Sequence, residues 1–197
     1  MKKQIKIEEI KTLEDKNIIK IITKIAHCFA ISSSNIIYGW GNNENGQLGF
    51  GDKKNRNLPE EIPYFKGIEI DDVKCGSRHS FFIEKNFHNI YCCGDNNLGE
   101  LGPENNKNYE KPQKFTFFKD KNNIIEISSG SFHLLCLLKN NEVYSWGYNY
   151  YGQLGLGDTN NNRNTSQIIE YLNDKKIIQI YCLNVSSLAL SRIYLLF

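Results

Sequence analysis

The chain has 197 residues, 40% of them hydrophobic and 23% charged, with a net charge of +2. This composition fits one globular domain with a packed core. The near-balanced charge gives no strong attraction to nucleic acid or to a membrane surface, so we expect neither as a direct partner. No stretch approaches the roughly 18 consecutive apolar residues of a membrane helix. The first residues lack the apolar segment of a signal peptide, and we therefore expect an intracellular protein, cytoplasmic or nuclear.

The cysteines argue against a metal site. No two of them stand in a C-x-x-C arrangement, which zinc sites commonly use. Several lie in apolar, strand-like runs, where cysteine behaves as a small hydrophobic residue. We interpret them as reduced core residues. They are Cys28, Cys75, Cys92, Cys93, Cys136 and Cys182.

In chain order, the predicted elements form a repeating succession. Residues 5–25 are ambiguous between strand and helix. From His27 an apolar run leads to a turn signal and then to a glycine-rich block that begins at Gly41. The same succession starts again at His79 and at His133, and the run 186–190 begins it a fourth time without a histidine. We therefore expect the tail of one repeat, then three full repeats, then the start of another.

Within a repeat, the short apolar runs predict hairpins. In the third repeat, residues 134–139 and 142–146 read as two strands joined by Asn140-Asn141. Asparagine tolerates the positive φ of tight turns, which supports this hairpin. The glycine-rich block and an asparagine-rich connection then lead to a further strand. Each repeat thus supplies about four short strands.

The spacing of the glycines is regular. Gly41, Gly94 and Gly147 lie 53 residues apart, and each is followed five and eight residues later by two more glycines. Four strands at a period near 50 residues are typical of a propeller blade. We predict an all-β fold, a partial β-propeller of four-stranded blades. It forms a single domain, 1–197, with repeats at about 11–62, 63–115 and 116–169 and a partial repeat at 170–197.

These residues resemble the regulator of chromosome condensation repeat family. The segments that carry the resemblance are Gly76-Ser77-Arg78-His79-Ser80, Val143-Tyr144-Ser145-Trp146-Gly147 and the run from Gly152 to Asp158. The first repeat departs from the pattern in having no glycine in Ile25-Ala26-His27, and the second has Cys93 in place of tryptophan. The resemblance implies propeller blades, of which family members typically close seven. It also implies guanine-nucleotide exchange on the small GTPase Ran, the activity of the founding member.

The repeated polar residues have structural interpretations. A histidine that recurs once per blade behaves as a hydrogen-bonding residue of the fold, whereas a catalytic histidine would be expected once. The segment Gly41-x-x-x-x-Gly46 is followed by glutamine, so it lacks the lysine of a phosphate-binding loop. Asp52 and Asp158 are suited to capping their loops. We therefore predict no catalytic residue, no cofactor site and no metal site.

Residues that differ between repeats are the candidates for function, because repeat proteins bind partners through variable loops on one face. Tyrosine and arginine are enriched in binding hot spots. Alternatively, these side chains are solvent-exposed loop residues without a binding role, or they pack between blades. The candidate partner-binding residues are Arg78, Asp95, Tyr148, Tyr150 and Tyr151.

Two functions follow from these observations. The first is a non-enzymatic protein-interaction module, a scaffold or adaptor, which also self-associates through open blade edges because unpaired strands invite pairing. The second, implied by the family resemblance, is a guanine-nucleotide exchange factor for a small GTPase of the Ran type.

Overall fold

The structure, a computed structural model, describes residues 9–102, 105–116, 124–159, 162–192 and 195–196. Within them the fold consists of antiparallel sheets in which each strand pairs with the next in the chain. Blade 1 contains β1 (Ile18–Lys24), β2 (His27–Ser32), β3 (Ile37–Gly41) and β4 (Arg56–Glu61). Blade 2 contains β5 (Ile70–Cys75), β6 (His79–Glu84), β7 (Ile90–Gly94) and β8 (Tyr109–Lys114). Blade 3 contains β9 (Ile124–Ser129), β10 (His133–Leu138), β11 (Val143–Gly147) and β12 (Arg163–Ile168). Blade 4 contains β13 (Ile177–Cys182), β14 (Ser187–Ser191) and β15 (Leu195–Leu196).

Short 3-10 helices lie between the strands. They are η1 (Lys11–Leu13), η2 (Pro63–Phe65), η3 (Lys85–Phe87) and η5 (Glu170–Leu172). Of these, η1, η2 and η5 directly precede the first strand of a blade. The described part of the ambiguous region, residues 9–25, contains η1 and β1, and residues 5–8 lie outside the described residues. The predicted hairpin of the third repeat is confirmed, since Asn141 sits between β10 and β11 with a φ of 68°.

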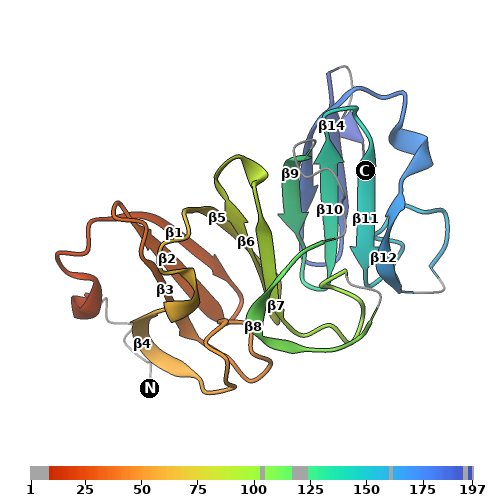
Figure 1. Ribbon diagram of the computed structural model, residues 1–197. Helices are drawn as coiled ribbons and strands as arrows, with labels where there is room; N and C mark the ends of the chain where they lie inside the picture. Colours follow the sequence, from red (N-terminus) through yellow and green to blue (C-terminus); the bar gives the residue numbers. More distant parts are fainter. Residues whose placement is uncertain (1–8, 103–104, 117–123, 160–161, 193–194, 197) are drawn as a thin grey trace, which may run out of the picture.

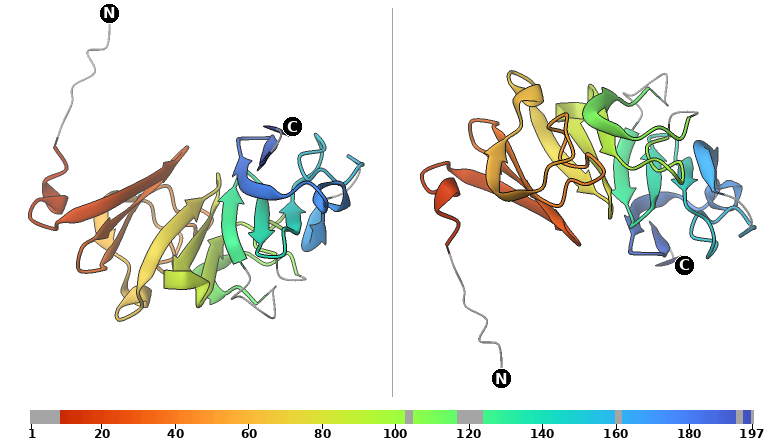
Figure 2. Two further views of the ribbon diagram at one scale, coloured as in Figure 1. Left: turned by 90° about the horizontal axis from the view of Figure 1, so that it is seen from above. Right: turned by 90° about the horizontal axis from the view of Figure 1, so that it is seen from below.

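The blades follow one another in chain order across the molecule (Figure 1). Their first strands touch in succession, β1 against β5, β5 against β9 and β9 against β13. Blades 1 and 4 lie at opposite ends of the row and the ring is not closed (Figure 2). The predicted all-β, partial propeller is confirmed.

The glycine that ends the third strand of each full blade is required by a close approach between backbones. Gly94 has a φ of 109°, and a Cβ atom there would lie 2.2 Å from the carbonyl oxygen of Arg78. The equivalent Gly41 and Gly147 show the same approach to Ala26 and Phe132. A side chain would therefore push the hairpin apart. This explains why the glycine recurs in register.

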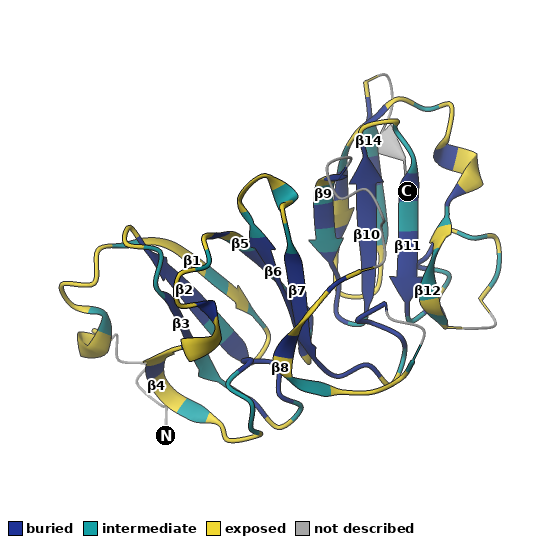
Figure 3. Ribbon diagram, viewed as in Figure 1, coloured by how far each residue is buried: buried dark blue, intermediate teal, exposed yellow. Residues whose placement is uncertain are grey.

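The apolar core lies between blades. One cluster joins Phe29 and Leu48 of blade 1 to Phe82 of blade 2, a second joins blades 2 and 3 around Phe81 and Trp146, and a third joins blades 3 and 4. The middle strands are accordingly buried, whereas β1, which no blade precedes among the described residues, is partly exposed (Figure 3). Each blade is therefore stabilised chiefly by its neighbours.

The recurring histidines connect one blade to the next. His27 Nε2 lies 3.0 Å from Ser80 Oγ, and His133 Nε2 lies 3.0 Å from Ser187 Oγ. Leucine occupies the equivalent serine position in blade 3, and there Ser129 Oγ takes over, 2.9 Å from His79 Nε2. The structural role predicted for these histidines is confirmed.

The protonation state of the histidines follows from these contacts. Each serine hydroxyl donates its hydrogen to a backbone carbonyl, and so accepts one from the histidine Nε2–H. Each Nδ1 is buried without a partner among the described residues. Burial lowers the pKa of His27 to about 4, of His79 to about 3 and of His133 to about 4. All three are neutral at physiological pH.

Candidate interaction surface

The glycine-rich loops are held by a buried asparagine in each full blade. Asn43 Nδ2 donates to the Asp52 carbonyl oxygen at 2.9 Å, and its Oδ1 accepts from Leu48 N at 2.9 Å. Asn149 makes the same contacts with Asp158 and Leu154. A hydrogen bond from Arg56 is the main cause that lowers the pKa of Asp52 to about 2. The capping role predicted for the two aspartates is confirmed, and it makes these loops ordered platforms.

The loops that precede the histidines meet the glycine loops at one end of the blades. The amide nitrogens of Asn42, Asp95 and Tyr148 each donate to a carbonyl oxygen of the facing loop at 2.8 Å. Between these loops lies an open hollow of about 600 Å³. It is lined from three blades, by Ala26 and Asn42, by Ser77 and Arg78, and by Ser131 and Phe132. The hollow therefore offers one surface built from three repeats.

Arg78 lies on this surface and is exposed. Its guanidinium nitrogen is 3.8 Å from Asp95 Oδ2, but the side chain of Asp95 is itself only 5% exposed. Asp95 Oδ1 accepts from the backbone and side chain of Asn97 and so fixes the second glycine loop. Of the five predicted residues, Asp95 is thus buried and unsuited to direct contact with a partner.

A buried glutamate stands behind this pair. Glu100 is fully buried, and its Oε2 accepts from Leu98 N, whereas Oε1 has no partner among the described residues. Burial, with a smaller contribution from the Asp95 charge, raises the pKa of Glu100 to about 7. The sequence signal for it was available, because repeats 1 and 3 have Gln47 and Gln153 in the same place.

The three predicted tyrosines form one cluster. Tyr148 and Tyr150 stack with ring centroids 6.3 Å apart, and Tyr150 meets Tyr151 edge-on at 5.2 Å. Tyr150 is 67% and Tyr151 64% exposed. Phe132, which lines the hollow, contacts Tyr148 at 6.3 Å. The tyrosine cluster (Tyr148, Tyr150 and Tyr151) is therefore continuous with the hollow and with Arg78.

The part of the chain that the structure describes contains no group of three or more histidine, cysteine, aspartate or glutamate side chains placed to hold a metal ion. None of its helices is long and apolar enough to cross a membrane. All six cysteines are free thiols, and five of them are buried.

The fold and the repeated junctions define the class of this protein, an open β-propeller built from sequence repeats. It belongs to the family of the regulator of chromosome condensation (RCC1) repeat, whose model matches residues 34–83, 88–137 and 140–190.

Known proteins share this region. The chain is 33% identical over 148 residues to the Arabidopsis thaliana ultraviolet-B receptor UVR8, covering 75% of this chain and 33% of the receptor. It is 32% identical over 168 residues to the mouse E3 ubiquitin-protein ligase HERC2, covering 84% of this chain and 3% of the ligase. The structure of Prp20p from Saccharomyces cerevisiae matches with a TM-score of 0.77 at 23% identity, over 90% of this chain and 45% of that one. The chain therefore spans a third or less of these curated relatives.

Proposed function

We propose that this chain is a non-enzymatic protein-interaction module, a scaffold or adaptor, that binds its partner through the hollow and the tyrosine cluster. The observation that carries the proposal is the exposure of Tyr150 and Tyr151 beside a hollow shared by three blades. Exposed aromatic residues next to an arginine are a common composition of binding hot spots. The rigid loops lower the entropy cost of binding because little has to be ordered.

The rest of the chemistry supports this assignment. Each histidine lies beside a serine hydroxyl, but these pairs stand in the blade junctions and each hydroxyl donates to a backbone carbonyl, so we assign them a structural role and no enzymatic one. A location inside the cell, cytoplasmic or nuclear, accords with six free thiols.

The test is capture of partners from cell lysate by three forms of the tagged chain. These are the wild type, the double variant Arg78→Ala with Tyr150→Ala, and the control Tyr64→Ala. Tyr64 lies on η2 and is 40% exposed, so the control variant removes an exposed tyrosine outside the hollow and the tyrosine cluster. A partner bound by the wild type and the control but lost from the double variant supports the proposal. A partner retained equally by all three contradicts it.

A second candidate is guanine-nucleotide exchange on a small GTPase of the Ran type. Two similarities favour it. The chain is 29% identical over 135 residues to the X-linked retinitis pigmentosa GTPase regulator of the dog, covering 68% of this chain and 13% of that protein. The crystal structure of Prp20p, which shares the fold, was described together with its binding properties to Gsp1p and histones.

The same capture with and without EDTA separates the two functions. EDTA removes Mg²⁺, and with it nucleotide, from small GTPases, which is the form an exchange factor binds best. A GTPase captured mainly in EDTA, together with faster release of a fluorescent guanine nucleotide, would favour exchange. Partners whose capture is unaffected by EDTA would favour the interaction module over the exchange factor.

A further inference from the structure

The turns that border the hollow are joined to one another through their backbones. In blades 2 and 3 they are residues 76–78 and 130–132, which connect the first strand of the blade to the second. Ser77 N donates to the Ser131 carbonyl oxygen at 2.9 Å, and Ser131 N donates to the Asn184 carbonyl oxygen of blade 4 at 2.9 Å. Neighbouring turns thus support each other, and the side chains of these serines are not needed for it.

Ser131 carries an unused polar group. The residue lines the hollow and is only 4% exposed, yet its hydroxyl makes no hydrogen bond with the described residues. The serines at the blade junctions differ, because Ser80, Ser129 and Ser187 each meet a histidine. A nearly buried hydroxyl without a partner costs free energy, which a ligand that accepts its hydrogen would recover.

Arg78 carries more unused donors. Its side chain is 57% exposed beside Ser77, and its guanidinium makes no hydrogen bond with the described residues. It faces Asp95 at 3.8 Å, but the Asp95 carboxylate accepts from Asn97 of its own loop. A guanidinium has N–H donors in a planar fork that matches the two oxygens of a carboxylate. Arg78 is therefore available for an anion from outside the chain.

The charges around the hollow decide which anion fits. Glu44 lines the hollow from blade 1, and Asp95 lies behind Arg78. Arg78 is the only cation among the described residues of the lining, and the neighbouring Lys24 donates to the Ser129 carbonyl oxygen at 3.0 Å. A singly charged carboxylate is balanced by Arg78, whereas a phosphate group carries nearly two charges and would be repelled by the two acids.

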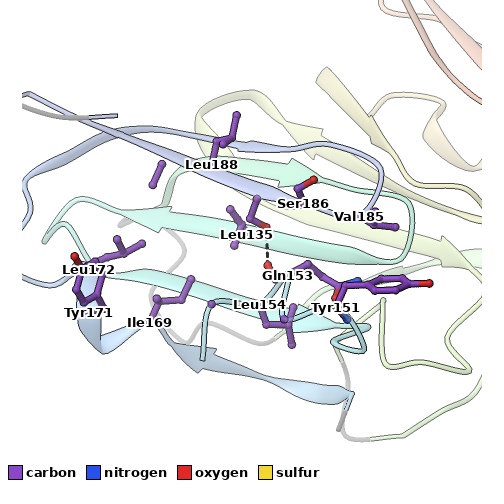
Figure 4. Close-up of a pocket in the computed structure, with 14 residues that line it drawn as sticks. Leu135, Tyr151, Gln153, Leu154, Ile169, Tyr171, Leu172, Val185, Ser186 and Leu188 are labelled. Atoms are coloured by element: carbon purple, nitrogen blue, oxygen red, sulfur yellow. Dashed lines mark hydrogen bonds between the residues drawn. The ribbon is translucent and has the colours of Figure 1, made fainter. Parts of the chain in front are cut away.

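The pocket between blades 3 and 4 offers no comparable group. It has a volume of about 310 Å³ and mostly apolar walls (Figure 4). Among the described residues that line it there is no charged side chain, and its Ser187 hydroxyl already donates to the Gln153 carbonyl oxygen at 2.7 Å. An anion therefore finds unused donors at the hollow and not in this pocket.

We propose that the hollow binds the side-chain carboxylate of a glutamate or aspartate on a partner protein. Arg78 supplies the forked hydrogen bonds and the charge, and the Ser131 hydroxyl supplies a further hydrogen bond. Ala26 and Phe132 also line the hollow, so an apolar residue beside the acidic one would find contacts there. This inference rests on the proposed function, because it names the chemistry of the partner that the hollow binds.

The probe is a fluorescently labelled peptide, Gly-Leu-Glu-Leu-Gly, whose binding is followed by anisotropy up to a Kd of about 1 mM. The matched peptide has glutamine in place of glutamate, which keeps the shape and removes the charge. We expect the glutamate peptide to bind at least about fivefold more tightly, because hydrogen bonds between charged groups are the stronger ones. A third peptide, with phosphoserine in the same place, should bind more weakly than the glutamate peptide.

Protein variants place the binding in the hollow. Arg78→Gln should abolish the preference for glutamate over glutamine. The control Arg192→Gln, at an exposed arginine directly after β14, makes the same change of charge and should keep the preference. Ser131→Ala should weaken binding of the glutamate peptide at least about twofold. Since its hydroxyl has no partner in the free protein, this variant should melt at the wild-type temperature or above, unlike a variant of a structural serine.

Several results would overturn the proposal. They are equal binding of the glutamate and glutamine peptides, tighter binding of the phosphoserine peptide, binding of no peptide, a preference that survives Arg78→Gln, and unchanged binding by Ser131→Ala. Equal peptide binding, together with a captured partner that Arg78→Ala with Tyr150→Ala loses, would overturn this inference and leave the proposed function standing. A captured partner that all forms retain would contradict the proposed function whatever the peptides show.

Discussion

Acid should destabilise this protein at pH values well above the range in which carboxylates usually titrate, because unfolding exposes the buried histidines to protonation. In the folded state His27, His79 and His133 have pKa values of about 4, 3 and 4, against 6.5 for an accessible histidine. Below pH 6.5 the unfolded chain therefore binds more protons than the folded one. Stability contributed by neutral histidines is present above pH 6.5 and is lost as the pH falls toward 4.

The magnitude follows from linkage. Between pH 7.5 and pH 5, each histidine costs about 2 kcal/mol, and the three together about 6 kcal/mol. Glu100 acts in the opposite direction, since its pKa is raised to about 7 and its protonated form is the one favoured by folding. Protonation of Glu100 therefore adds roughly 2 kcal/mol to the free energy of unfolding between pH 7.5 and pH 5. The net loss, about 4 kcal/mol, is a large part of the 5–15 kcal/mol typical of a domain.

The assay is urea unfolding at pH 7.5, 6.5, 5.5 and 5, followed by the fluorescence of buried Trp146. We expect the midpoint to fall steadily below pH 6.5 with an unchanged slope. Constant or rising stability down to pH 5 would refute the assignment of the histidines as neutral, desolvated links between blades. The Glu100→Gln variant isolates the contribution of the histidines. Its free energy of unfolding should fall by about 6 kcal/mol between pH 7.5 and pH 5.

Three further predictions concern single positions. Glu100→Gln should raise stability at pH 7.5 by up to about 3 kcal/mol in the same urea assay, because it removes a buried charge where two repeats already have glutamine; no gain would contradict the burial argument. Gly76→Ala should cost about 1–3 kcal/mol or more, since its Cβ would lie 2.0 Å from the His79 ring, whereas Gly157→Ala, with nothing within 4 Å, should cost only the strain of its positive φ, about 1–2 kcal/mol; equal thermal shifts would contradict this. Sedimentation should show concentration-dependent self-association that Ile21→Lys weakens, because Ile21 on open β1 is 65% exposed; a monomer at all concentrations would rule it out.

The repeat made most of the fold predictable from the sequence. Glycines and leucines in register identify the hairpins and loops because close backbone contacts and blade junctions each need one residue type. The same reasoning assigned the histidines and the capping aspartates correctly. The position of a residue within the repeat, however, does not show how many neighbours its blade has. Trp40 and Trp146 occupy the same repeat position, yet Trp146 is fully buried and Trp40 only partly, because no blade precedes blade 1 among the described residues.

The candidate surface was predicted less completely. Arg78 and the tyrosines were selected because they differ between repeats; in the structure they lie at one end of the blades, and their role in binding stays a prediction. Asp95 met the same criterion but is buried, since its carboxylate holds the backbone of its own loop. Phe132 and Glu100 were missed. Phe132 lines a hollow that three blades form together, which no single repeat encodes. Glu100 could have been noticed, because Gln47 and Gln153 occupy its position in the other two repeats.

Departures from the repeat have different meanings at the surface and at the junctions. A variable loop residue such as Tyr150 alters the exposed surface and leaves the blade intact. A changed junction residue instead alters the packing between two blades: Cys93 belongs to the cluster between blades 1 and 2, whereas Trp146 fills the equivalent position between blades 2 and 3. Ile21 and Val73 show the scale of this effect: they are equivalent strand positions, but the first is 65% exposed and the second 1%. Burying one such side chain is worth about 1.5–3 kcal/mol. Contact between neighbouring blades is therefore a main source of stability in this fold.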